Sequence, residues 1–357
     1  MNSISHEIPM NFSPDYLILM LTDACNLECA YCYLGKNKSS HTMAPSIIDR
    51  AIDLALASET PFHVQLSGGE PTLVPQAVNH AAQRLRTLSP ASTLGLQTNA
   101  TCIDRTMADM MLQFHMYVGV SLDGPPHIQE KLRGKAKETF QGLQYLEERK
   151  IPFTITTVVT RENVFHLHSL VMVLGGFAQA RGLGLDLLVH KGNAPKGLAP
   201  GPSALEKGIK KMVTALDAVN RMRHVPLQLR ELNRLISPVQ GKTASHFCHA
   251  AIHKSLAVTP RGDLYPCSQT AFDPDFSWGT LDNPHFMNAP MSLARVDPAK
   301  DLGRDDCRTC FLADRCPGDC PGRIHYNGNA QLACVMYKTL FTHNIKLTDK
   351  STSVKTV

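Results

Sequence analysis

The sequence predicts an α/β fold of six β/α units followed by a smaller region rich in cysteine. Between residue 15 and about residue 191, short apolar runs alternate with longer segments of helical periodicity. This alternation implies parallel strands joined by right-handed crossovers. Six units are fewer than the eight of a closed barrel. Seven of the eleven cysteines follow residue 240, which predicts a second region of different construction.

The expected strands are short and apolar, and each precedes a helical pattern. They cover residues 16–21, 62–67, 93–98, 117–122, 153–159 and 183–189. The expected helices cover residues 44–58, 75–89, 104–114, 139–150, about 163–181, and 203–222. The first helix is predicted from apolar residues close to a 3.6-residue period, namely Ile47, Ile48, Ala51, Ile52, Leu54 and Ala55. A proline- and glycine-rich stretch at 195–202 breaks the β/α rhythm before the last helix.

We expect four parts along the chain of 357 residues. Residues 1–195 form the core of β/α units, 196–240 a linker or helical bridge, 241–345 the cysteine-rich domain, and 346–357 a disordered tail. The net charge of +5 is spread without a dense basic run, which argues against a nucleic-acid partner. No apolar run approaches the roughly 18 residues of a membrane span, so no membrane partner is expected.

The number of cysteines also bears on the compartment. Eleven cysteines in a chain without a signal peptide indicate metal ligation in a reducing compartment rather than disulfides. We therefore expect a cytoplasmic, oxygen-sensitive protein.

The first cysteines form the triplet Cys25, Cys29 and Cys32, with spacing C-x3-C-x2-C and no further cysteine until Cys102. A structural zinc site normally takes four protein ligands. Three thiolates on a four-iron cluster leave one iron open to a small cofactor. The alternatives are a zinc knuckle or three buried cysteines.

With Tyr31 just before its last cysteine, the triplet resembles the signature of the radical S-adenosylmethionine (SAM) superfamily. The resemblance implies a [4Fe–4S] cluster whose open iron chelates the amino and carboxylate groups of SAM. The reduced cluster would cleave SAM to a 5′-deoxyadenosyl radical. The six β/α units are similar to the family's open, partial (β/α)6 barrel.

Polar motifs follow the next three predicted strands, where chemistry collects in parallel α/β folds. Gly68, Gly69 and Glu70 follow the second strand and resemble the family's Gly-Gly-Glu motif, which holds the SAM ammonium; an ordinary turn is the alternative. The third strand ends at Thr98 and Asn99 and the fourth at Ser121 and Asp123. These four polar residues are candidates for the ribose, the methionine carboxylate or the substrate, with helix caps and turns as the alternative.

The later cysteines closely resemble the SPASM extension of many radical SAM enzymes, with two zinc sites as the alternative. By analogy, the nearer of two auxiliary [4Fe–4S] clusters is held by Cys248, Cys267 and Cys320, and the farther by Cys307, Cys310, Cys316 and Cys334. Seven thiolates leave one coordination site without a cysteine, because Lys254 stands where some relatives have an extra one. That iron is either open or bound by His249 or His253.

The stretches at 118–125, 139–140 and 156–160 look most like the peptide- and sulfatase-maturing branch. In the sulfatase-maturing relatives an aspartate general base follows the second auxiliary cysteine, whereas Ser268 stands here. That argues against formylglycine formation, unless Asp263 or Asp273 compensates. Ser268, Asp123 and Cys102 are the candidate catalytic residues, and Cys102 keeps epimerisation open as a hydrogen donor.

The leading hypothesis is a maturase that abstracts a hydrogen atom from a residue of a ribosomally made peptide and then oxidises or, as the first expectation, cross-links it. The alternatives are a sulfatase-type formylglycine maturase, a radical SAM enzyme acting on a small molecule, or a non-enzymatic Fe–S or zinc protein. We expect a reductant such as flavodoxin or ferredoxin. Because some fourteen residues precede the first strand, recognition would use a separate peptide-recognition protein or the barrel itself.

Overall fold

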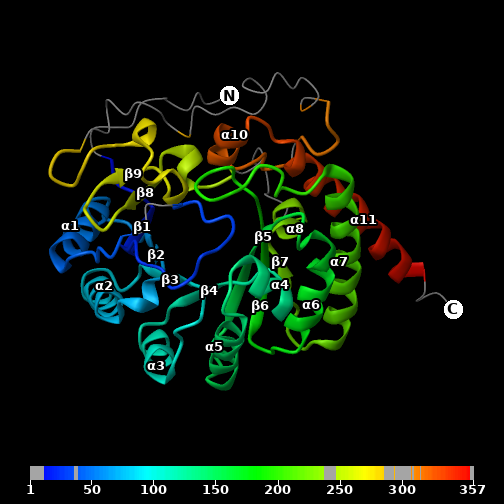
Figure 1. Ribbon diagram of the computed structural model, residues 1–357, viewed down its shortest axis with the longest axis horizontal. Coiled ribbons are helices and arrows are strands. Elements are labelled where there is room, and N and C mark those ends of the chain that lie inside the picture. The colour runs from blue at the N-terminus through cyan, green and yellow to red at the C-terminus, as the bar shows by residue number, and fades with distance from the viewer. Residues whose placement is uncertain are drawn as a thin grey trace.

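A single twisted sheet forms the centre of the computed structural model, which describes residues 12–35, 39–236, 247–284, 293, 307, 309–313 and 315–353. Six strands follow one another in chain order and pair in parallel: β1 (Tyr16–Thr22), β2 (His63–Gly68), β3 (Thr93–Thr98), β4 (Tyr117–Ser121), β5 (Phe153–Val159) and β6 (Ala180–Leu187). The sheet curves without closing (Figure 1). The predicted partial barrel of six β/α units is confirmed.

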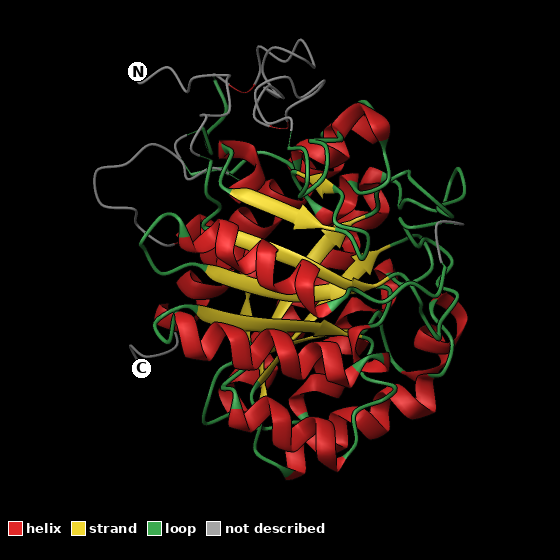
Figure 2. Ribbon diagram, turned by 90° about the vertical axis from the view of Figure 1, so that its left-hand side faces the viewer, coloured by secondary structure: helices red, strands yellow, loops and turns green. Residues whose placement is uncertain are grey.

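Helices cover the outer, convex face of this sheet (Figure 2). They are α1 (Pro45–Leu56), α2 (Pro75–Leu88), α3 (Arg105–Gln113), α5 (Ala136–Glu148), α6 (Leu167–Gly175) and α7 (Pro202–Met222). The short helix α4 (Pro126–Leu132) instead packs beside the cysteine loop, with Tyr31 and Leu198. Four of these helices, α1, α2, α4 and α7, have proline in the first turn, where its missing N–H is not needed. Because the six barrel strands are parallel, the loops that lead from each strand to the next helix gather at the carboxyl edge of the sheet.

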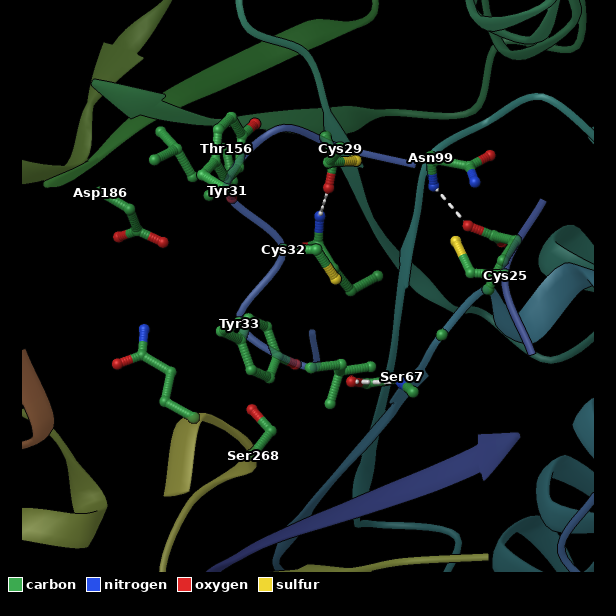
Figure 3. A pocket seen from close by; sticks show the side chains of 18 of the residues that line it. Cys25, Cys29, Tyr31, Cys32, Tyr33, Ser67, Asn99, Thr156, Asp186 and Ser268 are labelled. Carbon is green, nitrogen blue, oxygen red and sulfur yellow. Dashed lines mark hydrogen bonds between the residues drawn. The ribbon is translucent and has the colours of Figure 1, made fainter. Parts of the chain in front are cut away.

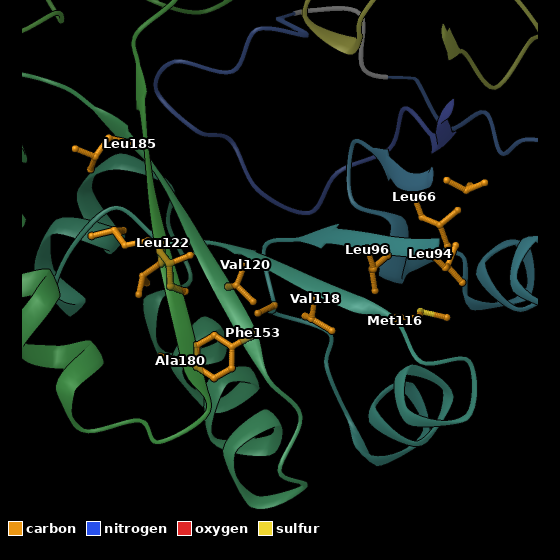
Figure 4. Packing of buried hydrophobic residues seen from close by; sticks show 14 of the residues in the cluster. Leu66, Leu94, Leu96, Met116, Val118, Val120, Leu122, Phe153, Ala180 and Leu185 are labelled. Atoms are coloured by element: carbon orange, nitrogen blue, oxygen red, sulfur yellow. The ribbon is translucent and has the colours of Figure 1, made fainter. Parts of the chain in front are cut away.

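The main core lies between the sheet and these helices (Figure 4). Leu66, Leu96, Val120 and Phe153 are each no more than 1% exposed. Full burial of such a side chain contributes about 1.5–3 kcal/mol. Packing of the helices against the outer face of the sheet thus holds the strands, and with them the strand ends that form the site.

The prediction and the structure differ most clearly at three elements of the barrel. The strand β6 starts at Ala180, three residues before the predicted start, because the weakly apolar Ala-Arg-Gly start still finds pairing partners on β5. A 3-10 turn at Val164–His166 and the end of α6 at Gly175 shorten the helix predicted at about 163–181. The helix α4 was not predicted, because its start lies within a stretch that reads as a turn.

The cysteine-rich region continues the same sheet. The strand β8 (Ser255–Val258) pairs in parallel with β1 on the side opposite to β2, and β9 (Leu264–Tyr265) pairs antiparallel with β8. At the other end, β7 (Gln228–Leu229) pairs with β6 and leads into α8 (Arg230–Ile236). The sheet therefore has nine strands in the order β7-β6-β5-β4-β3-β2-β1-β8-β9.

The chain ends in α10 (Pro321–Asn327) and α11 (Gln331–Ser353). The helix α11 packs against α7 and α8 (Figure 1). It includes residues 346–353, so this part of the predicted disordered tail is helical, and residues 354–357 lie outside the described residues. Among the helices of the described chain, none combines the length and apolarity needed to cross a membrane.

Candidate functional site

A cavity of about 410 Å³ opens at the carboxyl ends of the barrel strands. The loop after β1 contributes Cys25, Cys29 and Cys32, and Figure 3 shows these side chains facing the same space. Other predicted residues also line it, and they come from the ends of β2, β3 and β4 and from the turn after Cys267: Gly68, Gly69, Glu70, Thr98, Asn99, Ser121 and Ser268. The structure therefore brings together residues from five separate segments of the chain.

The cysteine loop is held by backbone contacts on both sides. Within it, the N–H of Cys32 donates to the carbonyl of Cys29 at 3.2 Å. From outside, the N–H of Asn193 donates to the carbonyl of Cys32 at 2.9 Å, and the N–H of Ala30 donates to the carbonyl of Leu132 at 2.9 Å. The loop is thereby fixed to the segments that follow β6 and α4.

The two glycines after β2 allow the start of the cysteine loop to lie directly against them. A Cβ on Gly69 would lie 2.0 Å from the carbonyl oxygen of Ala24, and one on Gly68, whose φ is +130°, would lie 2.3 Å from that of Thr22. The N–H of Gly69 donates to Thr22 at 2.7 Å. Only glycine fits this approach, so the Gly-Gly pair sets the distance between the two loops.

Glu70 is 1% exposed and ties the ends of β2 and β3 together. Its Oε1 accepts from the hydroxyls of Thr72 and Thr98, each at 2.6 Å, and its Oε2 accepts from the N–H of Asn99 at 2.7 Å. Burial raises the pKa of Glu70, and these hydrogen bonds oppose the rise. The carboxylate is thus held rigidly at the cavity wall, with capacity left on Oε2 for a further donor.

Asp123 is fully buried and does not line the cavity. Its carboxylate accepts from the hydroxyl of Tyr31, from Nε of Arg133 at 2.9 Å and from the N–H of Val158 at 3.0 Å. Its oxygens are therefore occupied by donors of the chain itself. Through Tyr31, Asp123 fixes the cysteine loop between Cys29 and Cys32.

The other two candidate catalytic residues lie in different surroundings. Ser268 lines the cavity close to Tyr33 (Figure 3). Burial raises the pKa of Tyr33, and a hydrogen bond with Ser268 opposes the rise. Cys102 does not line the cavity; its sulfur accepts from Nδ2 of Asn26, next to Cys25, at 3.4 Å.

The carboxylates considered as substitutes for the missing aspartate lie outside the cavity lining. Asp263 accepts from the hydroxyl of Thr259 at 2.8 Å, and Asp273 accepts from the hydroxyl of Tyr326 at 2.6 Å. Neither is among the lining residues.

The later cysteines fall into two groups. Burial is the main cause that raises the pKa of Cys320 to about 12, and Cys267 and Cys248 add to the rise. Burial likewise raises the pKa of Cys316 to about 11, to which Cys334, Cys310 and Cys307 add. The thiols of Cys248 and Cys267 thus act on Cys320, and those of Cys307, Cys310 and Cys334 act on Cys316.

The two histidines considered as additional ligands flank the first set. The ring of His249 stacks on Tyr16 with centroids 5.2 Å apart. His253 is 7% exposed and has a φ of +54°.

Three charged residues that line the cavity were not predicted: Arg133, which binds Asp123, Asp186 at the end of β6 and Arg230 at the start of α8. Nη2 of Arg230 donates to Oδ1 of Asp186 at 2.7 Å. They are 44 residues apart, so no local pattern links them. The signal that the sequence offered was a charged residue, Asp186, near the end of the largely buried strand β6.

The set of donors in the cavity fits a cluster better than a single ion. No disulfide joins any of the eleven cysteines. In the described part of the chain, no three His, Cys, Asp or Glu side chains converge on the position of one metal ion. The ligands of a cubane do not converge in this way, since each binds a different iron. Three thiols at one cavity, without a fourth cysteine in its lining, match a cluster with one open iron.

Comparison with known proteins agrees with this geometry. Residues 19–172 match the family model of the radical SAM superfamily. The serine-type anaerobic sulfatase-maturating enzyme of Klebsiella aerogenes is 24% identical over 372 residues, which cover 93% of this chain and 87% of that protein.

Two solved structures share the fold. The structure of anSMEcpe with bound AdoMet and the Cp18Cys peptide has a TM-score of 0.74 at 19% identity and covers 95% of this chain and 99% of that one. The structure of SuiB from Streptococcus suis, bound to the precursor peptide SuiA, has a TM-score of 0.66 at 14% identity and covers 89% and 74%.

Proposed function

We propose that the chain is a radical SAM enzyme of the SPASM type, since residues 19–172 match the radical SAM superfamily, and that it modifies a residue of a ribosomally made peptide. SAM and a [4Fe–4S] cluster are the cofactors of this family. When bound, they supply a 5′-deoxyadenosyl radical, which would take a hydrogen atom from the peptide. The cavity that combines three loop thiols with the Gly-Gly-Glu turn is the observation that carries this proposal.

Cys25, Cys29 and Cys32 would hold the cluster. Support comes from their common cavity and from the absence of a fourth cysteine in its lining. The buried contacts of Asp123 with Tyr31 and Arg133 would hold the loop in place as ligands are exchanged. We therefore assign Asp123 a positioning role rather than direct contact with SAM.

The SAM site would be formed by Gly68, Gly69, Glu70, Thr98, Asn99 and Ser121. The backbone carbonyls of the turn and the remaining capacity of Glu70 suit an ammonium group. Thr98 and Asn99 keep Glu70 in place through their own hydrogen bonds. Ser121, which accepts from Nε2 of Gln97 at 3.0 Å, still has a hydroxyl proton to donate to a ribose or carboxylate oxygen.

Two auxiliary [4Fe–4S] clusters would be held by the C-terminal cysteines, in a domain at about residues 241–345. The supporting observation is the division of the thiols into Cys248, Cys267 and Cys320 on one side and Cys307, Cys310, Cys316 and Cys334 on the other. Such clusters would accept an electron from the substrate radical. The nearer set borders the cavity, because Ser268 and Gln269, next to Cys267, line it.

A peptide is the favoured substrate, since the structures of anSMEcpe and SuiB hold the Cp18Cys peptide and the precursor peptide SuiA. A cross-link or a simple oxidation of one residue would be the product. A reductant such as flavodoxin or ferredoxin would supply the first electron, and a separate peptide-recognition protein is a further expected partner.

A sulfatase-type maturase is the second candidate, favoured by the similarity to the Klebsiella enzyme over 93% of the chain. The cavity argues against it. Ser268 occupies the place of the expected aspartate, and neither Asp263 nor Asp273 lines the cavity.

The first test is anaerobic reconstitution with iron and sulfide, followed by addition of SAM and dithionite. We expect 5′-deoxyadenosine and methionine in equal amounts. Replacing Cys25, Cys29 and Cys32 together by alanine should abolish both products while the iron bound by the C-terminal cysteines remains. A wild-type protein that carries its iron but forms no 5′-deoxyadenosine contradicts the proposal.

A further inference from the structure

The wall of the cavity formed by β6 and α8 carries a charged pair that the proposed chemistry does not use. Asp186 and Arg230 both line the cavity, and their side chains are 36% and 38% exposed. Figure 3 shows Asp186 across an open space from the cysteine loop. Charged groups at a cavity wall need a reason to stay there, because burying them costs free energy unless they are paired.

Arg230 is held in place from several sides. Its Nε donates to Glu231, which is 2% exposed, at 2.6 Å, and its Nη2 donates to Asp186 at 2.7 Å. A Cβ on Gly184 would lie 2.8 Å from the central carbon of the guanidinium. The guanidinium therefore lies flat against the backbone of β6, and its orientation is set before any ligand arrives.

The pair leaves one acceptor and one donor for a ligand. Within the described residues, Oδ2 of Asp186 and Nη1 of Arg230 have no hydrogen-bond partner, whereas Oδ1 and Nη2 bind each other. Both atoms are accessible, since neither is among the buried polar atoms that lack a partner. They are therefore available to a ligand in the cavity. An Asp–Arg pair of this kind presents acceptor and donor side by side.

The surroundings of the pair are balanced in charge. Asp186, Glu231 and Asp319 supply three carboxylates, and Arg230, Arg234 and Arg323 supply three guanidinium groups. Arg323 is itself paired with Asp319, at 2.8 Å from Nε. A neutral ligand with its own donor and acceptor matches this site better than a free cation or anion does.

We propose that Asp186 and Arg230 bind a neutral amide of the peptide substrate, Asp186 accepting its N–H and Arg230 donating to its C=O. In an extended segment, the N–H and C=O of one residue point to the same side, as they do in an antiparallel ladder. A side-chain carboxamide offers the same two groups. The inference rests on the proposed function and adds the way in which the peptide is held beside the cysteine loop.

The alternative use of Asp186, as a proton acceptor, fits less well. Burial by itself raises the pKa of Asp186, but Arg230 and Arg323 outweigh it, and the pKa lies below its ordinary value. A carboxylate of lowered pKa is a weak base. It remains an acceptor of hydrogen bonds over the whole physiological range.

The test uses anaerobic crystals of the reconstituted enzyme with SAM, soaked separately with three small probes. N-acetylglycine N-methylamide represents a peptide main chain, propanamide represents a side-chain carboxamide, and methylammonium represents a cation. We expect density for one or both amides with hydrogen bonds to Asp186 and Arg230. Their relative occupancy tells the main chain from the side chain as the source. Methylammonium alone at the pair, SAM itself on the pair, or no probe within hydrogen-bond distance overturns the proposal.

A variant gives the solution measurement. Asp186→Ala should weaken binding of the preferred amide, measured by ligand-observed NMR, by about tenfold or more, since a hydrogen bond to a charged group is lost. The matched control Asp217→Ala, whose carboxylate pairs with Arg221 on the exposed side of α7, should bind the amide as the wild type does.

The outcomes separate the two hypotheses. A wild-type enzyme that forms no 5′-deoxyadenosine contradicts the proposed function. A wild-type enzyme that forms it, together with unchanged amide binding in Asp186→Ala, contradicts only the inference about the pair.

Discussion

The two cysteine regions of this enzyme are positioned in different ways. The first three cysteines lie within eight residues, on one loop that follows a central strand and is held by backbone contacts. The seven cysteines of the second region are spread from Cys248 to Cys334, over short turns, strands of two to four residues and the start of α11. We therefore expect the barrel to build its site without a cofactor, and the C-terminal region to depend on the clusters proposed for it.

The hydrophobic cores that support the two regions also differ in size. The barrel strands and their helices share one large buried cluster. Part of the C-terminal region, including Leu256, Val258 and Trp278, joins this cluster. The rest packs on the other face of β1 through a smaller cluster: Ile18, Met20, Leu34, Ala250, Ala257, Tyr265, Ala271, Phe276 and Leu293. A small core contributes less free energy of folding, so bound iron should matter more there.

Removal of iron should separate the two regions most clearly. After anaerobic chelation, we expect amides around Cys248–Cys334 to lose most of their protection from hydrogen exchange, while β2 to β5 keep theirs. Hydrogen-exchange mass spectrometry before and after chelation measures both. Equal loss in the barrel strands contradicts the idea that the barrel is preformed.

Substitution of Asp123 should have the largest effect within the barrel. Asp123→Ala leaves Arg133 buried without its carboxylate, which costs about 3–5 kcal/mol of the free energy of unfolding. Urea unfolding of the iron-free protein measures this cost. The exposed pair of Asp217 and Arg221 is the control, because Asp217→Ala should cost no more than about 1 kcal/mol. Equal costs for the two variants argue against a structural role of Asp123.

Substitution of Gly69, which lies close to the carbonyl of Ala24, should have the next largest effect. Gly69→Ala places a methyl group against the carbonyl of Ala24, and crowding of this kind costs about 1–3 kcal/mol. The displaced cysteine loop should bind SAM more weakly, as measured by equilibrium dialysis of the reconstituted protein. Gly201→Ala, which meets no atom within 4 Å, should bind SAM as the wild type does.

The smallest expected effect lies at Lys191, which joins the two regions. Its Nζ donates to the carbonyls of Gln269 and Ala271 at 2.7 and 2.8 Å. Lys191→Met should lower the free energy of unfolding by about 1 kcal/mol. Lys196→Met, in the exposed part of the same loop, is the control and should have no effect.

The pH dependence of this contact has a definite sign. Burial lowers the pKa of Lys191 from 10.5 to about 8. Between these values the unfolded chain binds more protons than the folded one, so this group makes stability rise as the pH rises through that window. Lys191→Met should lose this part of the rise, and a difference curve that is flat in pH contradicts it.

The sequence predicted the structure best where a local pattern of residues itself determines the local structure. The bounds of β3 and β5 were predicted to the residue, because apolar runs between turn residues leave little freedom. Part of the cavity lining at the ends of β2, β3 and β4 was also predicted, because in a parallel sheet all strand ends meet at one edge. Gln65, Ser67 and Gln97, which line the cavity as well, were not predicted. Gly68 and Gly69 were recognised from their residue type alone, as two consecutive glycines at the end of a predicted strand.

Contacts between distant segments were not predictable in this way. The pairing of β8 with β1 joins segments more than 230 residues apart, and no periodicity in either one indicates the other. The pair of Asp186 and Arg230 depends on β7 bringing α8 beside β6. Asp123 was predicted to contact a ligand from its place at a strand end, yet the neighbouring Arg133 and Tyr31 enclose it completely.

The pairing of β8 with β1 has a consequence for any attempt to divide the protein. A fragment that ended at residue 240 would leave the hydrogen-bonding edge of β1 without its neighbour. The face of that strand which β8 and the following residues cover carries Ile18 and Met20, both buried in the whole chain. An uncovered apolar edge is a template for strand addition between molecules. The barrel alone should therefore aggregate through β1, which the C-terminal region covers in the whole chain.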